Sequence, residues 1–176
     1  MFEVEAKIKA GSTGPIRTRL IEKGAVFDKK SKQTDSYFNS PVRDFAKSDE
    51  ALRIRSEDGF SEITYKGPKV QGTGAKAREE FNVEISDPED MAGILERIGF
   101  FRSAEVFKTR EEFRFMETSV ALDSVDNLGE FVEIEVITDD RESALKKIEK
   151  VRKELEIFGD HIPESYLEMI INRINK

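Results

Sequence analysis

The chain contains no cysteine and only one histidine, His161, among its 176 residues. Without cysteine it can form no disulfide bond and can offer no thiolate as a nucleophile or metal ligand, which is typical of a protein in a reducing compartment. It also lacks an apolar run long enough to span a membrane, and its first residues do not contain the apolar segment of a secretory signal. We therefore expect a cytoplasmic protein with no membrane partner.

The chain also has no excess of positive charge, since it contains 29 lysines and arginines but 36 aspartates and glutamates, which gives a net charge of −7. This balance argues against a partner that is nucleic acid bound independently of its sequence. Hydrophobic residues make up 38% of the chain, which is enough for a core, and the length fits a single domain over residues 1–176. The charged fraction of 37% is high for a globular protein, so we next ask where the charges lie.

The chain begins with a segment in which charged and apolar side chains alternate. Because successive side chains of a strand point to opposite faces, Glu3, Glu5 and Lys7 share one face, and Val4 and Ala6 share the other. A solvated strand face is the simplest explanation for one such strand. Two closely spaced carboxylates are also what a hard divalent cation binds, and the charged face recurs in later strands.

The clearest of these later strands form a hairpin around the two-residue turn Asp58-Gly59. Its strands are expected over residues 51–57 and 60–66. The register pairs Arg55 with Glu62, Arg53 with Thr64, and Ala51 with Lys66. The three cations of the hairpin therefore share one face, and its large apolar residues share the other.

The remaining elements are predicted from hydrophobic periodicity and from glycine, proline and capping residues. Further strands are expected over residues 35–39, 78–85, 106–116, 120–125 and 130–138. Helices are expected between Pro15 and Gly24, over 88–97, from 139 to 158, and from about 163 to 174. Loops are expected over 40–50 and over the glycine-rich segment 67–77.

If these strands form one curved sheet, their charged faces point the same way. The cations on these faces are Lys7, Arg53, Arg55, Lys66, Arg78, Lys108 and Arg110, and the carboxylates are Glu3, Glu5, Glu80, Glu84, Asp123, Glu133 and Glu135. Burying an uncompensated charge is prohibitive, so such an interior must be wet or filled by a ligand. An antiparallel barrel of about eight strands can hold a ligand in this way, with helices covering its outside.

The mixture of charges indicates the chemistry of that ligand. Arginine and lysine bind phosphate oxygens, and grouped carboxylates hold Mg²⁺ or Mn²⁺, so a polyphosphate with its metal would satisfy both sets. No Gly-Lys-Ser/Thr phosphate loop is present, and the single histidine lies beyond the strands. A barrel that is merely stabilised by cross-strand salt bridges is the alternative.

The ordered set of these segments resembles the CYTH, or triphosphate tunnel metalloenzyme, superfamily. The first segment matches its E-x-E-x-K signature, and the later landmarks follow in order over nearly the whole chain. These landmarks are Asp35-Ser36-Tyr37-Phe38, Leu52-Arg53-Ile54-Arg55, Thr64-Tyr65-Lys66-Gly67, Arg78-Glu79-Glu80, Lys108-Thr109-Arg110, Leu122-Asp123 and Glu133-Ile134-Glu135. The resemblance implies an α+β fold with an eight-stranded antiparallel β-barrel, a tunnel for a triphosphate and a divalent metal.

The resemblance also implies a role for each matching residue. The metal ligands would be Glu3, Glu5, Asp123, Glu133 and Glu135. The phosphate-binding residues would be Arg53, Arg55, Lys66 and Arg110, with Arg78 and Lys108 as companions. The catalytic pair would be Lys7 and Tyr37. The implied cofactor is Mg²⁺ or Mn²⁺. The implied partner is a small-molecule triphosphate, and a homodimer is left open.

Within the superfamily, the segments 127–133, 138–140 and 163–166 look most like the class IV adenylyl cyclases. This resemblance implies conversion of ATP to 3′,5′-cyclic AMP and pyrophosphate. Two alternatives stay open: a hydrolase of thiamine triphosphate or inorganic triphosphate, and a non-catalytic polyphosphate-binding module. The complete set of carboxylates argues against the last, because binding alone would need mainly the cations.

Overall fold

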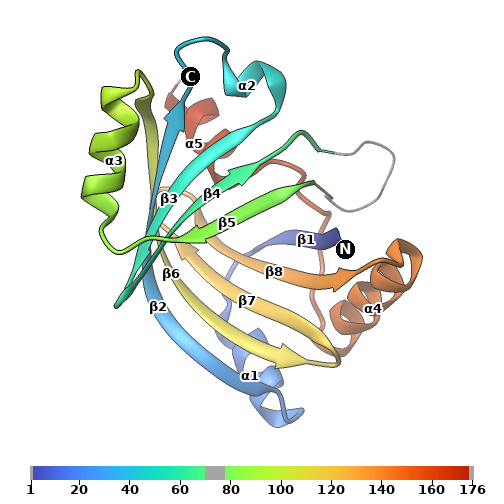
Figure 1. The fold of residues 1–176 in the computed structure, drawn as a ribbon. Coiled ribbons are helices and arrows are strands. Elements are labelled where there is room, and N and C mark those ends of the chain that lie inside the picture. The colour runs from blue at the N-terminus through green and yellow to red at the C-terminus, as the bar shows by residue number, and fades with distance from the viewer. Residues whose placement is uncertain (1, 70–77, 175–176) are drawn as a thin grey trace. The chain divides into compact units, whose positions relative to one another are not determined.

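The computed structural model describes residues 2–69 and 78–174. Its strands are β1 (Phe2–Ala10), β2 (Val26–Asn39), β3 (Ala51–Glu57), β4 (Phe60–Lys66), β5 (Glu80–Glu84), β6 (Phe101–Phe115), β7 (Thr118–Val125) and β8 (Gly129–Thr138) (Figure 1). Its helices are α1 (Gly14–Glu22), α2 (Phe45–Ser48), α3 (Pro88–Arg97), α4 (Arg141–Glu154) and α5 (Tyr166–Ile174). Most of the loop predicted over 67–77 lies outside the described residues.

The strands form one eight-stranded sheet in the order β1-β8-β7-β6-β2-β3-β4-β5. Every strand pair with a defined register is antiparallel. The predicted hairpin register is confirmed, because Arg55 lies opposite Glu62, Arg53 opposite Thr64 and Ala51 opposite Lys66. The predicted fold class, an α+β protein built on eight antiparallel strands with helices, is confirmed as well.

The described chain divides into two compact units. Unit 1 contains residues 2–31 and 108–163, and unit 2 contains residues 32–69, 78–107 and 164–174. The long strands β2 and β6 contribute residues to both units. The expectation of a single domain over residues 1–176 stays a prediction.

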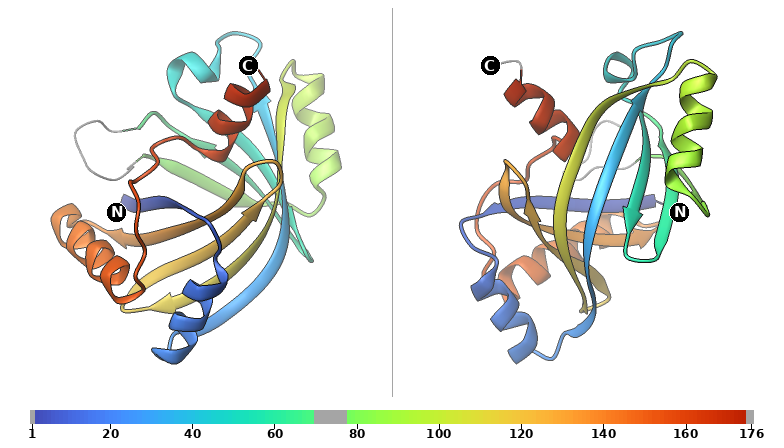
Figure 2. Two further views of the ribbon diagram at one scale, coloured as in Figure 1. Left: turned by 180° about the vertical axis from the view of Figure 1, so that it is seen from behind. Right: turned by 90° about the vertical axis from the view of Figure 1, so that its left-hand side faces the viewer.

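The core of unit 1 lies between one face of its strands and the helices α1 and α4. Val4 and Ile134, from β1 and β8, are almost completely buried together with Leu20 of α1 and Ile148 of α4. In Figure 2, α4 lies beside β8. These residues are the apolar half of the strand alternation and the apolar stripe of each helix, so the core follows from the two periodicities.

The core of unit 2 lies between α3 and the apolar faces of β2 and β3. Phe38 and Ile54 pack there against Ala92 and Leu95 of the helix. The helix begins where the sequence predicts, because the Asp87 side chain accepts hydrogen bonds from the first-turn N–H groups of residues 89 and 90.

Two strands are longer than their sequence pattern indicates. β2 begins at Val26 rather than at residue 35, and β6 begins at Phe101 rather than at 106. The first half of β2 has no apolar alternation, since it buries Ser31 and Gln33 instead of aliphatic residues. This half of β2 forms a strand because it pairs with β6, and an alternation of apolar and polar residues in the sequence cannot reveal that pairing.

Smaller differences concern loops and helix ends. The predicted loop 40–50 contains the short helix α2, which the side chain of Asp44 caps. Helix α4 ends at Glu154, four residues before the predicted end at residue 158, and α5 begins at Tyr166 rather than near 163. Strand alternation places Phe107 on the apolar face of β6 with Phe113, but Phe107 is 45% exposed.

Candidate functional site

The face of unit 1 that lies opposite its apolar core carries charged residues in rows across the strands. Lys7 of β1 lies directly opposite Glu133 of β8, and Asp123 of β7 lies directly opposite Arg110 of β6. These residues share strand parity, as the sequence predicts. The antiparallel register thus brings side chains that are far apart in the chain to neighbouring positions.

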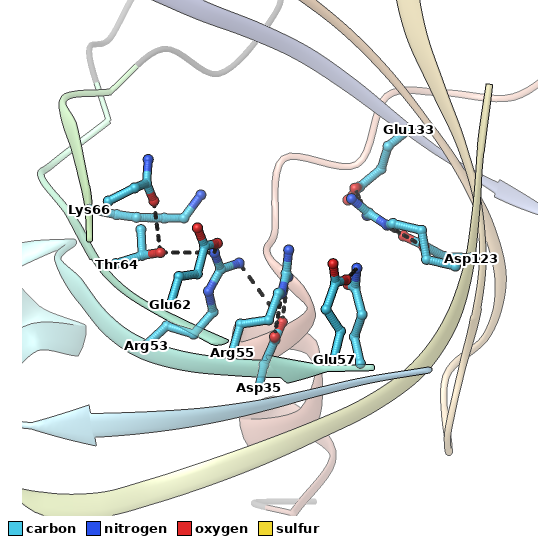
Figure 3. Close-up of polar contacts among 12 residues, drawn as sticks. Asp35, Arg53, Arg55, Glu57, Glu62, Thr64, Lys66, Asp123 and Glu133 are labelled. Atoms are coloured by element: carbon cyan, nitrogen blue, oxygen red, sulfur yellow. Dashed lines mark hydrogen bonds and ion pairs between the residues drawn. The ribbon is translucent and has the colours of Figure 1, made fainter. Parts of the chain in front are cut away.

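Four of these side chains form a continuous chain of ion pairs. The Lys7 ammonium lies 3.1 Å from Glu133 Oε1, and Arg110 donates to the other carboxylate oxygen of Glu133. Arg110 also donates through Nε and Nη2 to the two oxygens of Asp123, at 2.7 and 2.6 Å. Asp123 and Glu133 are labelled in Figure 3. Since Asp123 is 0% and Lys7 3% exposed, the network is held away from bulk water.

The environment of Glu133 keeps its carboxylate ionised. Burial raises the pKa of this group, but the nearby charges of Lys7, Arg110 and Lys108 outweigh burial and hold the pKa well below its ordinary value. A buried anion is tolerated here because it is paired and hydrogen-bonded. Arg110 is therefore fixed between two carboxylates.

The predicted metal ligands separate into two groups. Glu5 and Glu135 lie directly opposite each other on β1 and β8, and Glu3 lies one step further along the same face. Asp123 and Glu133 bind Arg110, and Glu5 of the first group lies 3.6 Å from the Lys7 ammonium. Within residues 2–69 and 78–174, no three acidic or histidine side chains are arranged as a ready metal site.

This arrangement still fits a hard divalent cation. Mg²⁺ is usually bound by one or two carboxylates, with waters and substrate phosphates completing its shell. The carboxylates of Glu5 and Glu135 supply oxygen ligands of that kind from directly opposed positions. They are the residues that could hold the metal, and Glu3 could assist them.

Unit 2 has a charged face of its own, on β2, β3, β4 and β5. Arg55 forms a two-point contact with Asp35, with Nε–Oδ1 and Nη2–Oδ2 distances of 2.6 and 2.7 Å. Arg53 donates from Nη2 to Glu62 at 3.1 Å, and Lys66 forms an ion pair with Glu80. Figure 3 shows Arg53 and Arg55 side by side on β3.

Three of the polar partners in unit 2 were missed as site residues by sequence reasoning. Glu62 and Thr64 could have been found from the sequence, because the predicted hairpin register already places them opposite Arg55 and Arg53. Asp35 is 2% exposed, and the only sequence feature that pointed to it was its position in the family landmark 35–38. Its pairing with Arg55 depends on the register between β2 and β3, which no short-range pattern specifies.

The remaining predicted residues are placed as follows. Tyr37 is buried and lies opposite Arg53, while Lys108 is buried on the same face as Arg110. Arg78 lies just before β5 and pairs with Asp49, with Nη2–Oδ1 at 3.5 Å. That Lys7 and Tyr37 act as a catalytic pair, and that the charged faces of both units line one tunnel, stay predictions.

The sheet buries lysine and arginine among carboxylates on one face and packs against helices on its apolar face. These features place the chain in the class of α+β proteins with a charged sheet face. Residues 1–166 match the CYTH domain family. The chain is 39% identical over 173 residues to the Methanocaldococcus jannaschii protein named "Putative adenylate cyclase MJ0240", covering 96% of this chain and 98% of that protein. The chain therefore belongs to the CYTH family.

Solved structures agree with this assignment. The PH1819 protein from Pyrococcus horikoshii OT3 superposes with a TM-score of 0.85 at 34% identity, over 97% of this chain and 99% of that one. A Hippeastrum protein, HpAC1, has the same fold, with a TM-score of 0.76 at 21% identity over 99% and 96% of the two chains; its structure is described as a putative adenylyl cyclase that reveals a dominant triphosphatase activity. Among the described residues, no helix has the length and apolar character that crossing a membrane requires.

Proposed function

We propose that the protein is a divalent-metal-dependent enzyme that acts on a triphosphate, and that its reaction is the cyclisation of ATP to 3′,5′-cyclic AMP and pyrophosphate. The observation that carries the proposal is the burial of Lys7, Arg53 and Lys108 on the polar strand faces, each less than 10% exposed. Cations held rigidly away from water interact strongly with phosphate charge and need little reorganisation during reaction.

In this reaction the ribose 3′-oxygen loses its proton and forms a bond to the α-phosphorus, while the bond from that phosphorus to pyrophosphate breaks. Arg53, Lys66 and Arg110 would bind the phosphate oxygens and stabilise the charge that builds up on the departing pyrophosphate. The divalent cation, when bound by Glu5 and Glu135, would supply further neutralisation of that charge. Lys7 and Tyr37 are proposed to orient the reacting groups.

Support for the cyclase over other triphosphate reactions comes from the name of the M. jannaschii relative and from the sequence segments near residues 127–133 and 163–166. The second candidate is a triphosphatase, which the activity described for HpAC1 favours. The same residues would serve that reaction, with water attacking a terminal phosphorus instead of the ribose oxygen attacking the α-phosphorus.

A product assay separates the two candidates. ATP, thiamine triphosphate and inorganic triphosphate are each incubated with Mg²⁺ or Mn²⁺, and cyclic AMP, pyrophosphate and orthophosphate are resolved. We expect equal amounts of cyclic AMP and pyrophosphate from ATP. Orthophosphate as the sole product, with efficient turnover of inorganic triphosphate, would replace the cyclase with the triphosphatase.

A further inference from the structure

A short hydrogen-bond relay runs across β3, β4 and β5 in unit 2. Arg53 Nη2 donates to the hydroxyl oxygen of Thr64 at 3.0 Å, and that hydroxyl donates to Oδ1 of Asn82 at 2.8 Å. The three residues occupy one row, because Arg53 lies opposite Thr64 and Thr64 opposite Asn82. Thr64 is 0% exposed, whereas Asn82 is exposed at the end strand of the sheet.

The chemistry of the relay fixes the direction of each hydrogen bond. A guanidinium has only donors, so Thr64 must accept from Arg53 and must give its single hydroxyl proton to another group. The amide oxygen of Asn82 is the acceptor for that proton. The amide group is therefore oriented with its oxygen toward Thr64, and its two N–H donors point elsewhere.

These N–H donors lie on the same strand face as the cations of unit 2. Within the described residues, no side chain accepts a hydrogen bond from Nδ2 of Asn82. The carboxylates beside it are already engaged, since Glu62 binds Arg53 and Glu80 binds Lys66. Lys66 is the diagonal neighbour of Asn82 across β4 and β5, a separation of about 7–8 Å that a phosphate group can bridge.

We infer that Asn82 is a further substrate-binding residue, which donates its amide N–H groups to a phosphate oxygen held between Arg53 and Lys66. Thr64 is a positioning residue that orients this amide and the Arg53 guanidinium at once. The inference rests on the proposed function, because it takes a triphosphate as the ligand. It adds a neutral donor to the charged residues that the sequence predicts to bind phosphate.

The test measures binding of inorganic triphosphate by calorimetry, with chelator present so that no turnover occurs. Asn82→Val removes the donors without adding charge, and Asn82→Asp replaces them with an acceptor while keeping an oxygen for Thr64. We expect each change to weaken binding about tenfold or more, as for a hydrogen bond to a charged group. Asn127→Asp, in the exposed turn between β7 and β8, is the control that adds the same charge and should bind like the wild type.

Thr64 is tested by a pair of variants. Thr64→Val keeps the shape and removes the hydroxyl, so it should lose affinity as Asn82→Val does, whereas Thr64→Ser keeps the hydroxyl and should recover most of it. Thermal unfolding is recorded for all variants. Asn82→Asp should unfold near the wild-type temperature because it keeps the oxygen that accepts from Thr64, whereas Asn82→Val should unfold at a lower temperature because the buried Thr64 hydroxyl loses its acceptor.

The outcomes distinguish the inference from the function on which it rests. Wild-type binding together with unchanged affinity in both Asn82 variants would overturn the role of Asn82 and leave the proposed function standing. A wild-type protein that binds triphosphate neither in chelator nor with excess Mg²⁺ would overturn the proposed function itself, and the role of Asn82 with it.

Discussion

At the scale of the residue, the most consequential contact in unit 1 is the pair formed by Arg110 and Asp123. Asp123 has no exposed surface, and both of its carboxylate oxygens accept from Arg110. Arg110→Ala would remove the two hydrogen bonds that this buried carboxylate accepts from the arginine. We expect the free energy of unfolding to fall by about 3 kcal/mol, measured by urea denaturation.

A double-mutant cycle identifies the source of that loss. Adding Asp123→Asn to Arg110→Ala removes the buried negative charge. The double variant should therefore lose less free energy of unfolding than the two single variants lose in sum. Strictly additive effects would show that Asp123 and Arg110 do not stabilise each other. Both changes should also reduce turnover, because an arginine proposed to bind phosphate is then absent or misplaced.

Glu133 gives a prediction about pH. Its pKa in the folded protein lies below the ordinary value, so its contribution to stability is present above the pKa of the unfolded chain. That contribution is lost as the pH falls below about 4.5 and through the folded pKa. Glu133→Gln should therefore flatten the fall in unfolding temperature between neutral and acidic pH, while Glu22→Gln in α1 should keep the wild-type profile. A wild-type profile in Glu133→Gln would contradict the assignment.

The residue scale also explains which site residues could be read from the sequence. Strand parity correctly places Lys7, Arg53, Arg110 and Glu133 on polar faces, because period 2 is a local property. It cannot tell which carboxylate pairs with which cation. That pairing depends on side-chain contacts across three or more strands.

At the scale of the element, the helices are held by their apolar faces. Leu20 of α1 is 0% exposed in the core of unit 1, while its neighbour Ile21 is 53% exposed. Leu20→Ala should lower the free energy of unfolding by about 3 kcal/mol, since it leaves a cavity. Ile21→Ala, a change of similar size on the same helix, should cost less than about 0.5 kcal/mol. Equal losses in urea denaturation would contradict the orientation of α1.

Helix α5 is anchored in unit 2 by an ion pair rather than by a large core. Glu168 accepts from Lys69 Nζ at 2.9 Å and from the backbone N–H of Ser165 at 2.6 Å. Burial raises the pKa of Glu168, but these hydrogen bonds outweigh it and lower the pKa to about 2. The anchor is therefore present at neutral pH and is lost as the pH falls from about 4.5 toward 2.

We expect Glu168→Gln to loosen α5 without unfolding the sheet. The protection factors of the α5 amides, corrected for the intrinsic exchange rate at each pH, should be lower than in the wild type at pH 7 and then change little on acidification, whereas those of the wild type should fall at low pH. The strands β3 and β4 serve as the internal control and should exchange alike in both proteins. Equal protection of α5 in variant and wild type at pH 7 would contradict the anchor.

Elements differ in how well the sequence specifies them. The β3–β4 hairpin has its turn, alternation and register in one continuous segment, and each was predicted correctly. The first half of β2 was missed because residues such as Ser31 and Gln33 give no apolar signal and the strand forms by pairing with distant β6. Local chemistry specifies hairpins and caps, and long-range pairing specifies the rest.

At the scale of the whole molecule, the order of eight antiparallel strands distributes the charged residues over polar faces in both units. The family could be recognised from the sequence because its landmarks sit on successive strands, and the CYTH match over residues 1–166 confirms it. The reaction could not be read in the same way. Cyclisation and hydrolysis need the same cations and differ in the position of the substrate's organic end.

The central claim is the proposal that the protein binds a triphosphate through Arg53 and Arg110. Its most direct test is calorimetric titration of inorganic triphosphate, in the presence of chelator, into the wild type, Arg53→Ala of unit 2 and Arg110→Ala of unit 1, with folding of each variant checked by circular dichroism. We predict one triphosphate per chain and a loss of affinity of about tenfold or more in each variant. Two triphosphates per chain, or wild-type affinity in either folded variant, would contradict the claim.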